Sequence, residues 1–255
     1  MIAGIDSQIG ASVASELISK GWRVIGTSRR LEANKGKEVF YCDFSSKQSI
    51  DNCSAILINL KIEIDILVIC VGVLNPIGSF EDLDPDVWEV GFYTNALGPI
   101  RFIRSLLSLM KSSKNAMVVT FAGGGINSAP TLYSSYTISK VALTKAMEIF
   151  AAENSNVRFV SLGTGWIKSP IHEQTLVAGP AAGDNRDELL RRIENNDFED
   201  INKVAEFILW AFDSAGSQVS GRNFSLVHDP WGKSELLSKL KSRPDYFKLR
   251  RFGSD

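Results

Sequence analysis

The chain has 255 residues, of which 28 are Lys or Arg and 29 are Asp or Glu, so its net charge is −1. A hydrophobic fraction of 44% with 22% charged residues is typical of a globular protein and excludes disordered and fibrous chains. The balanced charge provides no basic surface for nucleic acid, and no stretch reaches the ~18 uninterrupted apolar residues of a membrane helix, so we expect neither partner.

Short apolar runs alternate with helix-length amphipathic stretches along the whole chain. The runs predict strands near residues 1–3, 23–28, 38–41, 65–71, 116–121, 157–162 and 223–227. The stretches between them predict helices near 9–20, 47–60, 85–110, 134–153, 187–195 and 201–213. Nearly continuous apolar strands are typical of parallel sheets covered on both faces. We therefore predict one α/β domain over residues 1–255: a Rossmann-like, doubly wound, mostly parallel seven-stranded sheet flanked by helices on both faces.

One connection is too long for a plain loop. Residues 169–199 contain two prolines and two glycines and lie between a predicted strand and a predicted helix. Ligands of doubly wound folds bind at the carboxyl edge of the sheet, where this connection begins. We predict that residues 169–199 form a substrate lid.

The first predicted strand is followed directly by Gly4-Ile5-Asp6-Ser7-Gln8-Ile9-Gly10, which opens a helix. A strand, a tight glycine turn and a helix N-terminus place backbone N–H groups and a positive dipole end where a pyrophosphate can bind. Glycine spacing alone is a weak signal, and a simple connecting turn is the alternative.

The second predicted strand ends in Thr27-Ser28-Arg29-Arg30. Ser28 stands where an acidic side chain would hold a ribose hydroxyl, and Arg29 follows at once. A hydroxyl beside a guanidinium suits a phosphate on the ribose, because the anion gains charge-assisted hydrogen bonds. The sequence therefore favours NADP(H) over NAD(H), with a solvated arginine pair as the alternative.

Tyr136 and Lys140 lie four residues apart at the start of a predicted helix and so share one helix face. A nearby ammonium favours the phenolate, so such a pair can lower the pKa of the tyrosine from about 10 toward neutrality and make it a usable acid or base. A Tyr and Lys at this spacing also occur by chance on helix surfaces.

Taken together, these features resemble the short-chain dehydrogenase/reductase family, in its single-domain branch of about 250 residues, over essentially the whole chain. The family's landmarks occur here in order: Gly4 and Gly10 in the first turn, Asp43 after the third strand, Asn95 in the fourth helix, Tyr136 with Lys140, and the turn Gly163-Thr164-Gly165 after the sixth strand. Six landmarks in the right order are the reason for the assignment.

The resemblance implies a cofactor site and a set of roles. The residues implied to bind the cofactor are Gly4, Ser7, Gln8, Ile9, Gly10, Ser28, Arg29, Asp43, Phe44, Gly72, Tyr136, Lys140, Ile167 and Ser169. Within that set the turn residues would line the pyrophosphate, Asp43 and Phe44 would face the adenine, and Ile167 and Ser169 would meet the carboxamide. Gly72 is retained from a family motif whose preceding polar pair is lost here.

Three of the landmark residues have implied roles in the chemistry. Tyr136 would be the acid/base, and Lys140 would hold the nicotinamide ribose and tune Tyr136. Asn95 would shape a helix bend that holds a proton-relay water. For Asn95 the alternative is a helix surface residue, and for Asp43 it is a turn or cap acid.

The family's catalytic serine is absent. Positions 122 to 124, where it is expected, are Ala122, Gly123 and Gly124, which carry no side-chain donor. Removing one such donor typically costs on the order of 10² to 10³ in rate, which slows the reaction without abolishing it. Thr120 is expected to lie too deep to substitute. Ser128, in the loop that follows, is the candidate substitute, and a solvated loop serine is the alternative.

Residues on the substrate side carry a weaker signal. Trp166, His172, Glu173, Gln174 and Trp231 belong to segments expected to border the crevice. Trp166 is equally well explained as a core aromatic residue, and His172 with Glu173 as a surface pair. A weak similarity to reductases encoded with bacterial surface-polysaccharide enzymes gives a hint of a sugar-linked substrate.

We therefore expect an NADP(H)-dependent oxidoreductase that acts on a small carbonyl or alcohol compound, with a sugar-linked compound as one option. One alternative is a catalytically weak or inactive NADP(H)-binding sensor or subunit, because the serine is missing. A nucleotide-sugar epimerase or dehydratase is less favoured. By analogy with the family, the helices at 85–110 and 134–153 are expected to pair in a homodimer or homotetramer.

Two further features bear on location and metals. The first residues lack the basic flank and apolar segment of a secretory leader, which makes the cytoplasm the expected location. Cys42, Cys53 and Cys70 show no CxxC or Cys/His spacing, so we expect buried thiols and no metal site.

Overall fold

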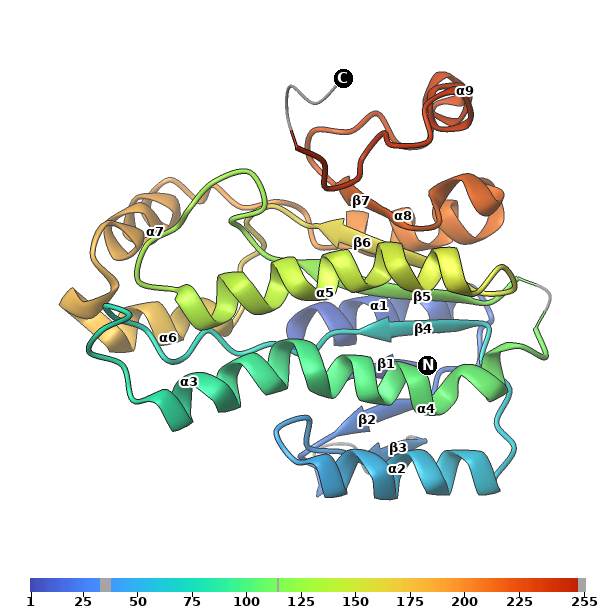
Figure 1. Cartoon of the computed structure of the whole chain (residues 1–255), viewed down its shortest axis with the longest axis horizontal. Coiled ribbons are helices and arrows are strands. Elements are labelled where there is room, and N and C mark those ends of the chain that lie inside the picture. The colour runs from blue at the N-terminus through green and yellow to red at the C-terminus, as the bar shows by residue number, and fades with distance from the viewer. Residues whose placement is uncertain (33–37, 114, 252–255) are drawn as a thin grey trace.

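The computed structural model describes residues 1–32, 38–113 and 115–251. Within these residues, seven parallel strands form one sheet in the order β3-β2-β1-β4-β5-β6-β7 (Figure 1). The strands are β1 (Ile2–Ala3), β2 (Gly26–Ser28), β3 (Val39–Tyr41), β4 (Ile66–Ile69), β5 (Met117–Ala122), β6 (Arg158–Gly163) and β7 (Arg222–Ser225). The predicted doubly wound parallel sheet is confirmed, and the order reverses direction between β1 and β4.

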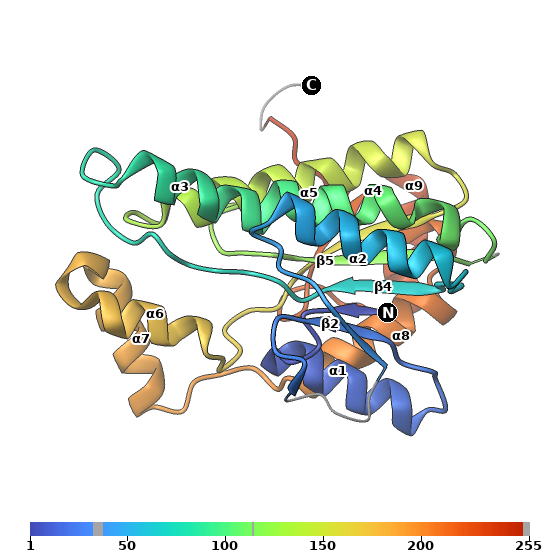
Figure 2. The same ribbon diagram turned by 90° about the horizontal axis from the view of Figure 1, so that it is seen from below.

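Helices cover both faces of the sheet, as Figure 2 shows from below. One face is covered by α1 (Gln8–Ser19) and α8 (Asn202–Asp213), and the other by α2 (Lys47–Asn59), α4 (Gly98–Met110) and α5 (Ser134–Glu153). The remaining helices are α3 (Pro85–Phe92), α6 (Ile171–Ala178), α7 (Asp184–Glu194) and α9 (Ser234–Ser242). Among the described residues, none of the helices combines the length and apolar character needed to cross a membrane.

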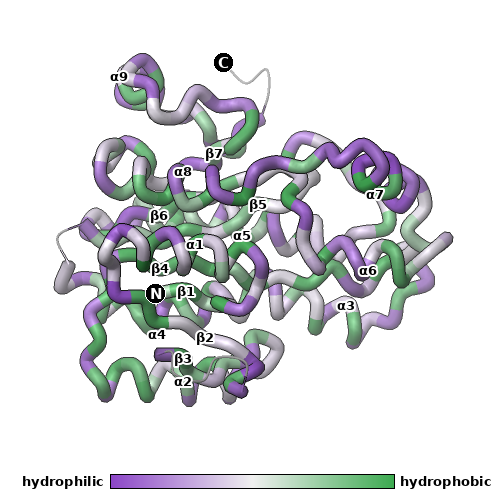
Figure 3. Tube along the Cα trace, turned by 180° about the vertical axis from the view of Figure 1, so that it is seen from behind, coloured by the Kyte–Doolittle hydropathy of each residue, from purple (hydrophilic) through white to green (hydrophobic). Residues whose placement is uncertain are grey.

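Alternate residues of each central strand supply the two cores. In β4, Ile66 and Val68 pack with the α1 and α8 side, whereas Leu67 and Ile69 pack with the α2, α4 and α5 side. This is the two-residue period of a strand buried on both faces, and it gives the green centre of Figure 3. Full burial of each such side chain contributes ~1.5–3 kcal/mol, so these strands hold the crevice edge rigidly in place.

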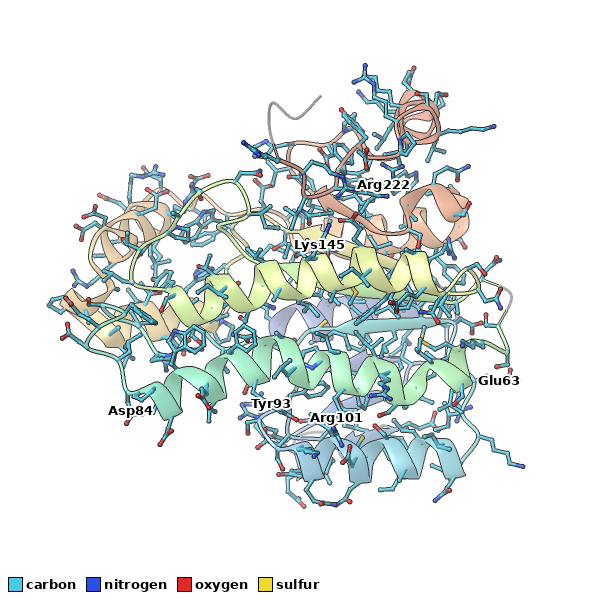
Figure 4. The ribbon with its side chains drawn as sticks, in the orientation of Figure 1. Glu63, Asp84, Tyr93, Arg101, Lys145 and Arg222 are labelled. Carbon is cyan, nitrogen blue, oxygen red and sulfur yellow. The ribbon has the colours of Figure 1, made fainter. Side chains whose placement is uncertain are left out.

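An ion pair joins two helices of one layer. Arg101 of α4, labelled in Figure 4, donates from Nε and from a terminal nitrogen to the two carboxylate oxygens of Asp51 in α2, at 2.5 Å each. Both side chains remain about a third exposed, so the pair orients the helices more than it stabilises them.

The helix predicted at residues 85–110 is interrupted. It consists of α3, a π-helical segment (Tyr93–Leu97) and α4. Pro99 has no N–H to donate to the carbonyl of Asn95 four residues earlier, which favours a break in the helical pattern at that point. The break turns Asn95 inward, where it is fully buried.

The segment 169–199 is helical over much of its length. It contains α6, a 3₁₀ turn (Gly179–Ala182) and α7. Both helices lie beyond the carboxyl ends of the strands, at the left of Figures 1 and 2. From here on, this segment is called the lid segment.

Candidate active site

Two adjoining cavities lie at the carboxyl ends of the strands. The first has a volume of about 490 Å³ and reaches the ends of β2 and β3, and the second has about 360 Å³ and reaches α5 and the lid segment. The residues that line both are Asp6, Ser7, Arg30, Cys70, Val71 and Gly72. Because the two cavities share these walls, they form one continuous crevice.

The predicted cofactor residues meet in this crevice, with one exception. Those that line it are Gly4, Ser7, Gln8, Ile9, Ser28, Arg29, Asp43, Phe44, Gly72, Tyr136, Lys140, Ile167 and Ser169. Gly10 is buried beneath the turn, where a Cβ would lie only 2.4 Å from the carbonyl oxygen of Gly4. Gly10 therefore allows α1 to pack closely on the turn.

Local hydrogen bonds fix the glycine turn. Gly4 has φ +77°, a conformation that side chains disfavour. The Ser7 hydroxyl donates to the Gly4 carbonyl oxygen at 2.8 Å and accepts from the Gly10 N–H at 3.0 Å, so it caps α1. The first N–H groups of α1 and its positive dipole end therefore face the crevice.

The end of β2 carries the cationic groups of the first cavity. Ser28 is buried, and its hydroxyl accepts the Arg30 N–H at 2.8 Å, whereas Arg29 is exposed and lines the cavity. Arg30 pairs with Asp6 of the glycine turn, Nε to Oδ2, at 2.7 Å. The sequence analysis did not identify this pair, which lies where the two cavities join. The presence of the acidic residue Asp6 inside the glycine turn could have indicated this pair.

Asp43 and Phe44 follow β3 and line the first cavity. The Asp43 carboxylate accepts from the Ser45 N–H at 2.9 Å and from the Ser45 hydroxyl at 2.8 Å, which is the geometry of a turn acid. Phe44 packs edge-on against Phe102 with ring centroids 5.2 Å apart, so its position is set by the core.

Asn95 and Lys140 converge on the backbone after β4. Asn95 donates from Nδ2 to the Val73 carbonyl and accepts the Val73 N–H at Oδ1, both at 2.8 Å. Lys140 Nζ donates to the Val71 carbonyl oxygen at 3.4 Å. A Cβ at Gly72 would lie 3.5 Å from Lys140 Nζ and 3.7 Å from Asn95 Oδ1, so the glycine lies between the two side chains.

Burial sets the electrostatics of Tyr136 and Lys140. It raises the pKa of Tyr136 to about 12 and lowers the pKa of Lys140 to about 8, an effect that the Cys70 thiol partly offsets. The ammonium lies over the Tyr136 ring, 5.8 Å from its centroid. The expectation that the Tyr136 pKa falls toward neutrality is therefore wrong for this structure, because desolvation of the phenol outweighs any effect of the ammonium.

The position of the missing serine is filled by the tyrosine itself. A Cβ on Gly123 would lie 2.7 to 2.9 Å from Cε1, Oη and Cζ of Tyr136, so the phenol packs directly on the glycine. Ser128 is exposed and lines neither cavity, and its loop position leaves it outside the crevice. Thr120 is fully buried and bonds the Ser161 hydroxyl at 3.1 Å, as its depth on the strand predicts.

The lid segment contributes His172 and Gln174 to the second cavity. His172 stacks on Trp166 with ring centroids 5.2 Å apart, and Arg192 Cζ lies over the Trp166 ring, 4.7 Å from its centroid. Trp166 therefore packs against the lid segment. Glu173 is exposed. Trp231 packs edge-on against Phe207 of α8, and its Nε1 donates to the Leu226 carbonyl oxygen. It does not line the crevice.

Comparison with known proteins agrees with the fold. A family model described as enoyl-(acyl carrier protein) reductase matches residues 4–227. An uncharacterised oxidoreductase of Schizosaccharomyces pombe, C663.09c, is 24% identical over 191 residues, which is 69% of this chain and 76% of that protein. An NADPH-dependent pterin aldehyde reductase of Arabidopsis thaliana is 23% identical over 182 residues, covering 67% of this chain and 75% of that protein.

Solved structures show the same fold at low sequence identity. A short-chain dehydrogenase/reductase of Saccharomyces cerevisiae superposes with a TM-score of 0.76 at 20% identity, covering 94% of this chain and 97% of that one. An actinorhodin polyketide ketoreductase variant, solved with NADPH, gives 0.72 at 20% identity, covering 88% and 94%. With its parallel sheet, its glycine turn and a family match over most of its length, the chain belongs to the short-chain dehydrogenase/reductase family of oxidoreductases.

Proposed function

We propose that this protein is an NADP(H)-dependent oxidoreductase that interconverts a small carbonyl compound and its alcohol, with Tyr136 as the acid/base. One observation carries the proposal: Tyr136, Lys140 and the glycine turn line one continuous crevice, whose other end holds Arg29. Hydride chemistry needs a dinucleotide, an acid and a substrate space in one place, and the crevice has residues for each.

The crevice fits a nicotinamide dinucleotide, the cofactor type of this family. The glycine turn leaves the N-terminus of α1 open to the crevice, as a pyrophosphate requires. The first cavity would hold the adenosine half against Asp43 and Phe44. In the second cavity, Lys140 would hold the ribose, and Ile167 and Ser169 would meet the carboxamide.

Two features support NADP(H) over NAD(H). Ser28 replaces the acid that would hold an unphosphorylated ribose, and Arg29 is an exposed guanidinium on the cavity wall. The NADPH-dependent reductase of Arabidopsis thaliana is a relative with this preference. Asp6 already pairs with Arg30, so Arg29 is the residue proposed to meet the phosphate.

The bound cofactor supplies or accepts the hydride. Tyr136 is protonated at neutral pH because its pKa is about 12, so it can donate its proton to a carbonyl oxygen that is being reduced. The phenolate that forms is stabilised by the Lys140 ammonium over the ring. Asn95 acts as a positioning residue, because it holds the Val73 backbone beside Lys140. The protonated Tyr136 can therefore serve as the acid of a carbonyl reduction near neutral pH.

The binding-only alternative is not favoured by the site. Loss of the serine donor costs on the order of 10² to 10³ in rate but leaves the acid and its cation in the cavity. The alternative would gain support only if the cofactor bound and no carbonyl compound were reduced.

The assembly is a second part of the proposal. Apolar side chains are exposed along the outer faces of α3, the π-helical segment and α5; they are Val87, Val90, Leu97, Ile138 and Ile149. These are the helices through which the family pairs, so we expect a homodimer or homotetramer. Sedimentation equilibrium measures this, and a monomer at micromolar concentration would contradict it.

Titration with NADPH and NADH, followed by a panel of aldehydes and ketones, tests the function. We expect NADPH to bind at least about tenfold more tightly than NADH, because of the added charge-assisted hydrogen bonds, and to be oxidised as alcohol forms. If NADPH binds but no member of the panel is reduced, the protein is a binding module. If neither cofactor binds, the proposal fails altogether.

A further inference from the structure

Three side chains fasten helix α6 over the second cavity. His172 bonds the Ile167 carbonyl through Nε2 at 2.9 Å, and Thr175 bonds the Tyr133 hydroxyl through Oγ1 at 2.7 Å. Gln174 lies between them and reaches the opposite wall of the crevice. Its Oε1 accepts the N–H groups of Leu74 and Asn75, at 2.8 and 3.0 Å.

These bonds determine which end of the Gln174 amide meets the backbone of Leu74 and Asn75. Leu74 and Asn75 both present backbone donors, so the atom that meets them must be the oxygen. The amide nitrogen, with its two N–H donors, is therefore the end of the amide that Leu74 and Asn75 do not bind. In the part of the chain that the structure describes, no partner is recorded for that nitrogen, and Gln174 lines the cavity together with Tyr136.

The donor is supplied from a different wall than the acid. Tyr136 lies on α5 and packs on Gly123, where the serine donor of the family is missing. Gln174 lies on α6, and the backbone N–H donors that hold its oxygen, those of Leu74 and Asn75, belong to neither α5 nor β5. Because both residues line the second cavity, the Gln174 amide is available to a second oxygen of a substrate whose carbonyl oxygen is held by Tyr136.

We propose that Gln174 is a substrate-binding residue whose amide nitrogen donates to a second oxygen beside the reacting carbonyl, so that the enzyme prefers vicinally oxygenated carbonyl compounds. The assignment rests on the proposed function, because it presumes that a carbonyl is reduced at Tyr136. Its basis is the anchored amide oxygen, the cavity that the residue lines and the loss of the donor at Gly123.

The substitution Gln174→Glu distinguishes the role of the amide oxygen from that of the amide nitrogen. A carboxylate has the same shape and still accepts from Leu74 and Asn75, but it offers no donor to the cavity. Gln174→Ala is the matched control, because it removes both ends. Hydrogen exchange at the Leu74 and Asn75 amides checks this without any turnover: protection is kept in the Glu variant and lost in the Ala variant.

The probes are butanone, with one oxygen, and diacetyl, which adds a second oxygen on the next carbon. In Gln174→Glu we expect kcat/KM for diacetyl to fall at least about tenfold more than kcat/KM for butanone, because only diacetyl loses a hydrogen bond and meets a carboxylate. Equal losses for the two probes, or no loss for either, would overturn the role of Gln174 alone. If the wild type reduces neither probe with NADPH, the proposed function fails for this substrate class and the assignment falls with it.

Discussion

The two cavities of the crevice are built in different ways. The first is formed mainly by the turns that follow β1, β2 and β3, which are short continuous segments such as 28–30 and 42–44, together with the backbone after β4. The second draws its walls from α5, the backbone after β4 and the lid segment, so Gln174 meets Leu74 from 100 residues away. The first cavity is lined by residues that the family resemblance predicted, such as Gly4 and Asp43, whereas in the second Tyr136 packs on Gly123, where no serine side chain is present. We therefore expect substitutions in the first cavity to act mainly on binding of the adenosine half of the cofactor, and those in the second to act mainly on the chemistry.

Tyr136→Phe removes the acid of the second cavity and leaves the residues of the first cavity unchanged. Without the phenolic hydroxyl the carbonyl oxygen has no proton donor, and we expect kcat to fall by about 10³-fold or more. The NADPH dissociation constant should stay within about twofold, since the first cavity is unchanged. Stopped-flow turnover and fluorescence titration measure the two quantities, and substantial remaining turnover would rule out Tyr136 as the acid.

Lys140→Met tests the cost of a buried cation in the second cavity. Burial lowers the pKa of Lys140 from 10.5 to about 8, so between these values the unfolded chain binds more protons than the folded one. The stability of the wild type should therefore rise as the pH increases from about 8 toward 10.5. At pH 7 the variant should be more stable by about 3 kcal/mol, because each pKa unit corresponds to about 1.36 kcal/mol.

Urea unfolding at several pH values measures this difference. Lys145→Met is the control: Lys145 lies on the same helix (Figure 4), but its side chain is 44% exposed and pairs with Glu148, so its removal should change stability by less than about 1 kcal/mol. Parallel pH profiles for the wild type and Lys140→Met would show that the ammonium carries no such penalty.

Arg29→Ala tests the first cavity alone. Loss of a charge-assisted contact to the ribose phosphate should weaken NADPH binding about 30-fold and leave NADH binding unchanged. Arg23→Ala removes the same charge from an exposed arginine that pairs with Glu38 outside the crevice, and it should change neither affinity. If both cofactors lose affinity equally in Arg29→Ala, the arginine does not discriminate between them.

Gly123→Ala tests whether the glycine at the position of the missing serine sets the place of the Tyr136 phenol. The added methyl group would meet the Tyr136 ring at less than 3 Å, so the phenol must move, and we expect kcat to fall about tenfold with unchanged NADPH binding. Gly124→Ala is the control, because nothing lies within 4 Å of its added Cβ. An active Gly123→Ala enzyme with wild-type kcat would mean that the position of the phenol does not depend on Gly123.

The sequence predicted the first cavity better than the second. The glycine turn and the end of β2 are short continuous segments whose spacing carries their geometry, so Gly4 and Arg29 could be assigned to one cavity in advance. Parallel pairing and two-sided burial likewise follow from apolar runs such as that of β4. Asn95 was identified from the resemblance, but its inward position depends on the helix break at Pro99, which periodicity alone does not reveal.

The rest depends on contacts between distant segments. The raised pKa of Tyr136 reflects desolvation of the phenol by the residues packed around it, which the spacing to Lys140 does not encode. Ser128 was selected for its place in a glycine-rich loop, yet that loop leaves it exposed. The pairing of Asp6 with Arg30 and the anchoring of Gln174 require knowing which strands and helices become neighbours.

Hydride transfer in the second cavity is tested most directly with NADPH that carries deuterium at the transferable C4 position. With a carbonyl compound that the wild type reduces, we expect deuterium on the carbinol carbon of the alcohol and one oxidised cofactor for each alcohol formed. Mass spectrometry of the product measures this. Alcohol without deuterium, from either deuterated face of the cofactor, would contradict hydride transfer in this crevice.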